Sequence, residues 1–93
     1  MKKAIWNGVV IAESDQTVEV EGNQYFPPSS IKKEYFTSTD SKSTCPWKGV
    51  ASYYSINVNG ETNTNAAWTY KRPSEMASEI KDHIAFWKGV EVK

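Results

Sequence analysis

The chain has 93 residues, which is enough for one domain with one hydrophobic core and too few for two, so we expect a single domain over residues 1–93. Eleven basic residues balance eleven acidic ones, and this zero net charge argues against nucleic-acid binding, which usually requires a basic surplus. One cysteine excludes an intrachain disulfide, and one cysteine with one histidine excludes the usual zinc site within one chain.

The N-terminal quarter of the chain predicts short antiparallel strands. Asn7-Gly8 separates two apolar runs, and Asn-Gly is the strongest two-residue hairpin signal because both turn positions need a positive φ. Residues 17–20 alternate between polar and apolar side chains, as a half-buried strand does. Residues 24–26 predict a short return strand, which Pro27-Pro28 ends.

The middle of the chain predicts a long hairpin preceded by a loop. We expect residues 34–36 to form a strand and the polar residues 37–44 to form a loop, because the latter show no periodicity. A long strand is predicted over residues 51–58 and a return strand over residues 65–70. Asn59-Gly60 lies between them as a second hairpin signal.

The C-terminal quarter contains the one expected helix, a short one near residues 74–82. Pro73 suits a first helical turn and Ser74 suits a helix cap. Residues 83–87 fit a continued helical spacing but are also rich in strand formers, and residues 90–92 predict a terminal strand. The chain is therefore predicted to be mainly β (small α+β): a compact antiparallel domain with one short helix.

The membrane-related signals are weak. No stretch approaches the roughly 20 apolar residues that a membrane span needs. The apolar run near the N-terminus is interrupted by Asn7-Gly8, so no signal peptide is predicted. We therefore expect a soluble, cytoplasmic protein that acts neither at a membrane nor on nucleic acid.

Several spaced motifs together resemble the family named domain of unknown function 427. The central motif is Cys45-Pro46-Trp47-Lys48-Gly49, followed by Ala51 and Tyr53, and further matches lie on both sides of it. They are Glu21-Gly22, Tyr25-Phe26-Pro27, Ala67-Trp68-x-Tyr70-x-x-Pro73 and Ile84-Ala85-Phe86-Trp87. The resemblance implies a small β-rich domain with a helix, in which residues 84–87 form a strand.

A nucleotidyltransferase label is sometimes attached to that family, but the residues give it little support. Such chemistry needs clustered carboxylates to hold magnesium and usually a phosphate-binding loop. The chain has no Asp-x-Asp pair and no P-loop or dinucleotide fingerprint. Glu19 and Glu21 share a strand face, which solvation alone explains. We predict neither a metal site nor a cofactor.

Cys45 is the first candidate for chemistry. A thiolate is a strong nucleophile, and a nearby cation such as Lys48 favours that form. His83, the one imidazole, is the candidate base, although nothing in the sequence places it beside Cys45. The alternative is that Cys45 is a small buried hydrophobe, and the sequence leaves both open.

Trp47, Lys48 and Gly49 are the second candidate, for binding. They combine a flat apolar face, a cation and a backbone that a ligand can approach closely, which suits an anionic ligand with a planar part. Ordinary core and turn roles are the alternative. The complete set of predicted ligand-binding residues is Cys45, Trp47, Lys48, Gly49, Tyr53, Trp68 and Tyr70.

Three functions follow from these candidates. The first is the binding of a small anionic or aromatic molecule in a cleft around Cys45–Gly49, favoured by four Trp, five Tyr and three Phe in so short a chain. The second is an enzyme that uses Cys45 as a reactive thiol. The third is a structural or interaction module, with the chain a monomer or a homodimer.

Overall fold

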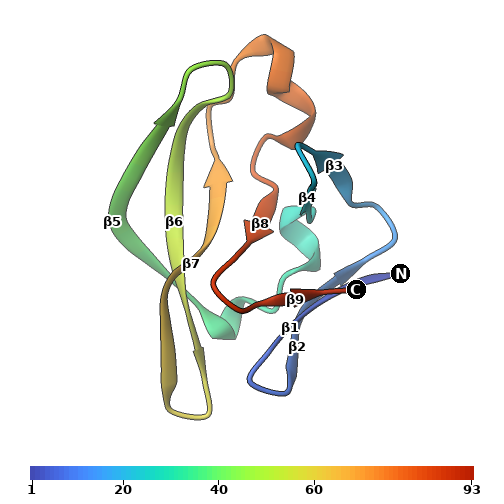
Figure 1. The fold of residues 1–93 in the computed structure, drawn as a ribbon, viewed down its shortest axis with the longest axis vertical. Helices are drawn as coiled ribbons and strands as arrows, with labels where there is room; N and C mark the ends of the chain where they lie inside the picture. The colour runs from blue at the N-terminus through green and yellow to red at the C-terminus, as the bar shows by residue number, and fades with distance from the viewer.

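The computed structural model describes residues 1–93 and consists of three antiparallel sheets (Figure 1). The terminal sheet has the order β2-β1-β9, the small hairpin is β3-β4, and the large sheet has the order β5-β6-β7-β8. The strands are β1 (Lys2–Trp6), β2 (Val9–Ser14), β3 (Val18–Val20), β4 (Asn23–Tyr25), β5 (Phe36–Cys45), β6 (Gly49–Val58), β7 (Glu61–Tyr70), β8 (Ile84–Phe86) and β9 (Glu91–Val92). Three short 3-10 helices complete the chain: η1 (Pro28–Ser30), η2 (Lys33–Tyr35) and η3 (Glu75–Ile80). The prediction of a small β-rich antiparallel fold is confirmed.

The two Asn-Gly turns form the hairpins that the sequence predicts. Asn7 and Gly8 have φ values of 52° and 76°, and they join β1 to β2. Asn59 and Gly60 have φ values of 52° and 81°, and they join β6 to β7. Positive φ at both positions gives the turn a twist that matches the right-handed twist of the strands, so the local sequence is sufficient to fix these two pairings.

β6 and β7 form the framework of the large sheet, and their pairing sorts the aromatic side chains onto faces. Tyr53 lies opposite Trp68, and the register shifts between Tyr54 and Ile56. Tyr54 and Ile56 pack with one hydrophobic cluster, whereas Tyr53 and Trp68 pack with another. The second cluster carries the site described below.

β5 corrects the prediction of a loop over residues 37–44. These residues form most of a ten-residue strand that pairs with β6 and lies at the edge of the large sheet (Figure 1). Most of its side chains are exposed, so the strand needs no apolar alternation, and its serines and threonines tolerate extended backbone. The strand expected over residues 34–36 is also wrong at its start. Tyr35 ends the 3-10 helix η2, in which its N–H donates to the Lys32 carbonyl at 3.1 Å.

The helix expected near residues 74–82 is present as the short 3-10 element η3, with a kink at Ala77. Ser74 does not cap it with its side chain. Its hydroxyl donates instead to the Trp47 carbonyl, which ties the start of η3 to the turn between β5 and β6. Residues 84–86 form β8 and pair with β7, so the strand implied by the family resemblance is confirmed.

The smaller sheets pack against the large sheet through backbone and aromatic contacts. Phe26 and Ile84 exchange two backbone hydrogen bonds of 2.8 Å, and the Phe26 ring meets Phe86 edge-to-face at 5.5 Å. The two ends of the chain lie side by side, because β1 pairs with β9 and Lys3 exchanges backbone hydrogen bonds with Lys93 (Figure 1). No helix in the chain has the length and apolar character needed to cross a membrane.

Candidate functional site

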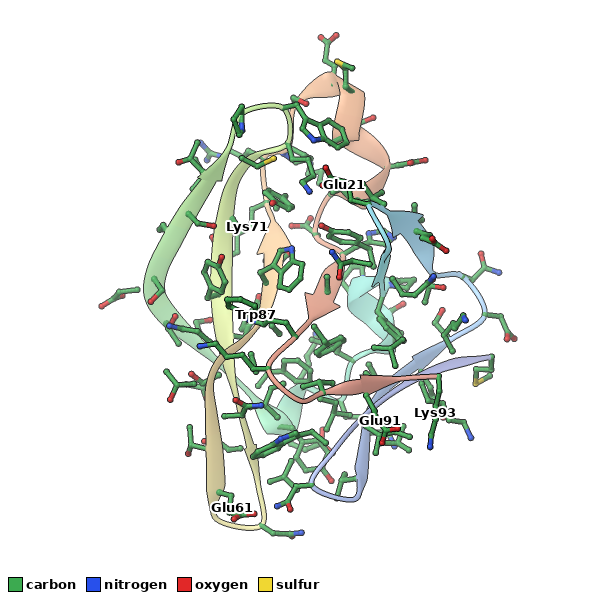
Figure 2. The ribbon with its side chains drawn as sticks, viewed as in Figure 1. Glu21, Glu61, Lys71, Trp87, Glu91 and Lys93 are labelled. Atoms are coloured by element: carbon green, nitrogen blue, oxygen red, sulfur yellow. The ribbon has the colours of Figure 1, made fainter.

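An aromatic cleft with a volume of about 210 Å³ lies on one face of the large sheet. Its walls come from β6, β7, the turn before β6 and the residue after β8. The five lining residues are Lys48, Tyr53, Trp68, Tyr70 and Trp87. Trp87 is 47% exposed, so it forms a lip at which the cleft meets solvent. Figure 2 shows Trp87 near the middle of the view and Glu21 above it, toward the turn between β5 and β6.

Three of the aromatic side chains that line the cleft are each held in place by a hydrogen bond from or to their polar atom. The Trp68 Nε1–H donates to the Tyr25 hydroxyl at 3.2 Å, and Tyr53 and Ser43 share a hydroxyl–hydroxyl bond of 2.8 Å. The Trp87 Nε1–H donates to the Asn65 carbonyl at 2.7 Å. Trp68 also meets Trp87 edge-to-face at 6.1 Å. These rings therefore lose little conformational freedom when a ligand enters.

Lys48 is the most unusual residue of the cleft, because it is a lysine with only 6% of its surface exposed. Its ammonium forms an ion pair with Glu21, whose side chain is 53% exposed. The same ammonium lies 5.4 Å from the centre of the Trp47 ring and 5.7 Å from the centre of the Tyr70 ring. The electron-rich ring faces and the carboxylate together compensate the lost hydration of the buried charge.

Lys48 and the ionisable groups around it shift one another's pKa values. The hydrogen bond from Lys48 lowers the pKa of Glu21, with a smaller contribution from the Trp47 N–H. Burial by itself lowers the pKa of Lys48, but the hydrogen bond to Glu21 and the nearby Tyr25 and Tyr70 give a net rise. Burial raises the pKa of Tyr70, and Lys48 partly opposes that rise. At neutral pH the site therefore holds an ammonium, a carboxylate and a neutral phenol.

The ion pair between Glu21 and Lys48 is expected to make stability pH-dependent at both extremes. The pKa of Glu21 lies below its ordinary value of 4.5, so the pair's contribution is complete above pH 4.5 and is lost as the pH falls through the lowered value. The pKa of Lys48 lies above 10.5, so the contribution is complete below that pH and is lost as the pH rises through the raised value.

Thermal melting curves across the acid range check this dependence. The wild type should lose more stability on acidification than Glu21→Gln, in which no carboxylate at this position titrates. Parallel losses in the two proteins would show that the pair contributes nothing. Glu19→Gln is the matched control, because Glu19 belongs to the same small hairpin as Glu21 but accepts its hydrogen bond from Gln24 at 3.0 Å.

Gly49, the residue after Lys48, fixes the backbone that positions Lys48. Its φ is +114°, and a Cβ built there would lie 3.2 Å from the Arg72 carbonyl oxygen, so both the backbone conformation and the close approach favour glycine. The Ser74 N–H donates to the Lys48 carbonyl at 3.0 Å, which fixes the other side of the turn. Gly49 itself lines a separate groove on the sheet, beside Lys71 and Arg72, and not the aromatic cleft.

Cys45 and His83 lie apart from the cleft lining. Cys45 is half-buried and packs against the hydrophobic cluster that contains Tyr25 and Tyr70. His83 uses Nδ1 in a hydrogen bond of 2.9 Å with the Lys81 carbonyl, and no hydrogen bond links it to Cys45. The arrangement needed for a thiol activated by an imidazole is therefore not formed between them.

The structure gathers four of the seven predicted ligand-binding residues around one cleft, namely Lys48, Tyr53, Trp68 and Tyr70. Trp47 is 36% exposed and covers the Lys48 ammonium from outside the cleft lining. Sequence reasoning missed Trp87, Glu21 and Tyr25. Glu21 was placed in a turn, and no spacing rule connects it with a lysine 27 positions later. Trp87 offered one signal, its place in the family match Ile84-Ala85-Phe86-Trp87.

No three side chains among the histidine, cysteine, aspartate and glutamate residues come together in a way that could hold a metal ion. Glu21, the acidic residue at the cleft, is already engaged by Lys48. The residues of the cleft are thus suited to stacking and hydrogen bonding, and the structure offers no donor set that adds a metal to them.

Comparison with known proteins identifies the family of the chain. No curated protein matches the chain at a significant level. A family model described as "Domain of unknown function (DUF427)" matches residues 2–93, which is nearly the whole chain. The resemblance stated from the Cys45–Gly49 motif and its flanking matches is therefore confirmed: the chain belongs to the DUF427 family.

Proposed function

We propose that the chain binds a small planar ligand in the aromatic cleft. The observation that carries the proposal is a cleft lined by three hydrogen-bonded aromatic rings and by the buried Lys48. Aromatic walls with a few convergent polar groups are the usual composition of small-molecule sites. Rings that are already fixed avoid part of the entropic cost of ordering them on binding.

The size of the cleft restricts the ligand. Sites for drug-sized molecules have volumes of roughly 300–1,000 Å³. The aromatic cleft has about 210 Å³ and opens beside the exposed Trp87. It therefore suits one mono- or bicyclic ring, with any further group of the ligand extending past Trp87 into solvent.

Trp87→Ala is expected to reduce the affinity for such a ligand by about tenfold, because one aromatic stacking contact contributes about 1–3 kcal/mol. Thermal-shift screening of indole, quinoline, purine and benzamide compounds identifies a ligand. Titration with quenching of tryptophan fluorescence then measures affinity, since Trp68 and Trp87 both line the cleft.

Met76→Ala is the matched control, because Met76 is an apolar residue with 83% exposure on η3 and does not line the cleft. It should retain the wild-type affinity. The proposal is contradicted if no compound of the panel stabilises the wild type, or if a compound that does so binds Trp87→Ala equally well.

A further inference from the structure

The closed end of the aromatic cleft presents hydrogen-bond donors to a ligand. Lys48 lines the cleft and its ammonium has three N–H donors and no acceptor. The Tyr70 ring lies 5.7 Å from that ammonium, and its hydroxyl is a further donor at this end. A ligand that reaches this end therefore needs an acceptor atom that takes a hydrogen bond from Lys48 or from the Tyr70 hydroxyl.

The charge at this end is already balanced. The Glu21 carboxylate pairs with the Lys48 ammonium, and its second oxygen accepts from the Trp47 Nε1–H at 3.4 Å. A ligand carboxylate at Lys48 would share one ammonium with Glu21, and two carboxylates so close repel each other. It would also lose its own hydration, which costs far more for a charged group than for a carbonyl.

Lys88 is the other cation near the cleft, and it does not alter this balance. Its ammonium lies 5.0 Å from the centre of the Trp87 ring and donates to the Thr64 carbonyl at 3.1 Å. Lys88 is exposed, so water and salt screen its charge from the closed end.

Resting on the proposed function, we infer that the aromatic cleft selects an uncharged planar ligand with a carbonyl or amide acceptor, because Glu21 already neutralises Lys48. The inference replaces the anionic ligand expected from the sequence, in which Lys48 appeared as an unpaired cation. It also gives Glu21 a role: it determines the charge of the ligand without lining the cleft.

Two matched pairs of probes test this selection: indole-3-acetamide with indole-3-acetate, and nicotinamide with nicotinate. Within each pair the ring is the same and only the charge of the acceptor group differs. The wild type should bind the amide about tenfold more tightly than the carboxylate, as expected for one like-charge contact at a partly exposed site. Isothermal titration at neutral pH measures each affinity.

Glu21→Gln should shift the amide-to-carboxylate affinity ratio at least about tenfold toward the carboxylate, because it leaves the Lys48 charge uncompensated. Glu19→Gln removes the same charge from the same small hairpin but away from Lys48, so it should leave the ratio unchanged.

The outcomes separate this inference from the proposed function. If the wild type binds the carboxylates as tightly as the amides, or if Glu21→Gln and Glu19→Gln change the ratio equally, ligand binding stands and the inferred selectivity is wrong. If the wild type binds neither member of either pair while other planar compounds stabilise it, the inferred acceptor is wrong. If no planar compound binds, the proposed function and the inference fail together.

Discussion

Replacing Phe26 by alanine is expected to lower the free energy of unfolding by about 3–5 kcal/mol, the range for truncating a buried phenylalanine. Phe26 is 0% exposed, and its ring packs edge-to-face against Phe86. Its backbone is bonded to Ile84, so the side chain lies where the smaller sheets meet β8. The total free energy of unfolding of a small domain is about 5–15 kcal/mol, so this substitution removes a large share of the stability.

Urea unfolding followed by circular dichroism measures the loss. Phe26→Leu is the matched control, because it retains an apolar side chain of similar bulk and should cost less than about 1.5 kcal/mol. Equal losses for the two variants would mean that the cavity does not determine the effect. A loss below about 1 kcal/mol for Phe26→Ala would contradict the packing described for this residue.

Gly49→Ala is expected to lower the free energy of unfolding by about 3 kcal/mol, because the new side chain has two separate unfavourable effects. The φ of +114° is a conformation that side chains rarely adopt, and the added Cβ would lie 3.2 Å from the Arg72 carbonyl oxygen. Since Gly49 follows Lys48 directly, the strain is also expected to weaken ligand binding. Urea unfolding and titration with the probes of the cleft measure the two effects.

Gly60→Ala separates the two penalties. Gly60 also has a positive φ, of +81°, but a Cβ there would meet nothing within 4 Å. Gly60→Ala should therefore lower the free energy of unfolding by only about 1–2 kcal/mol, which is the effect of the left-handed conformation alone. Ligand affinity should be unchanged in Gly60→Ala. Equal effects of the two substitutions on stability would contradict the close approach between Gly49 and Arg72.

The parts of the fold that could be predicted are those whose information is local. Asn7-Gly8 and Asn59-Gly60 fix their hairpins because both residues of each turn adopt the positive φ that such turns need. β5 could not be predicted from periodicity, because an edge strand with exposed side chains has no apolar face to display. The 3-10 helix at residues 33–35 depends on one backbone hydrogen bond, and the side chains of these residues give no sign of it.

The sequence was enough to predict most residues that line the cleft, but not the residues that support them. Lys48, Tyr53, Trp68 and Tyr70 were found because a dense motif leads into a strand with an aromatic partner strand, and antiparallel pairing brings them together. The charge balance at Lys48 was missed, because it depends on how the small hairpin docks onto the large sheet. Glu21 becomes a partner only after that docking.

The contacts that complete the aromatic cleft also determine when it forms during folding. β6 and β7 meet through a two-residue turn, which closes early, whereas Glu21 and Lys48 are separated by 27 positions and Tyr25 and Trp68 by 43. Contacts of such long range form late, because the entropy of closing a long loop must be overcome first. We therefore expect partial opening of the small hairpin β3-β4 to separate Glu21 from Lys48 and Tyr25 from Trp68 while β6 and β7 stay paired. Ligand affinity would then fall with the stability of this hairpin against local unfolding.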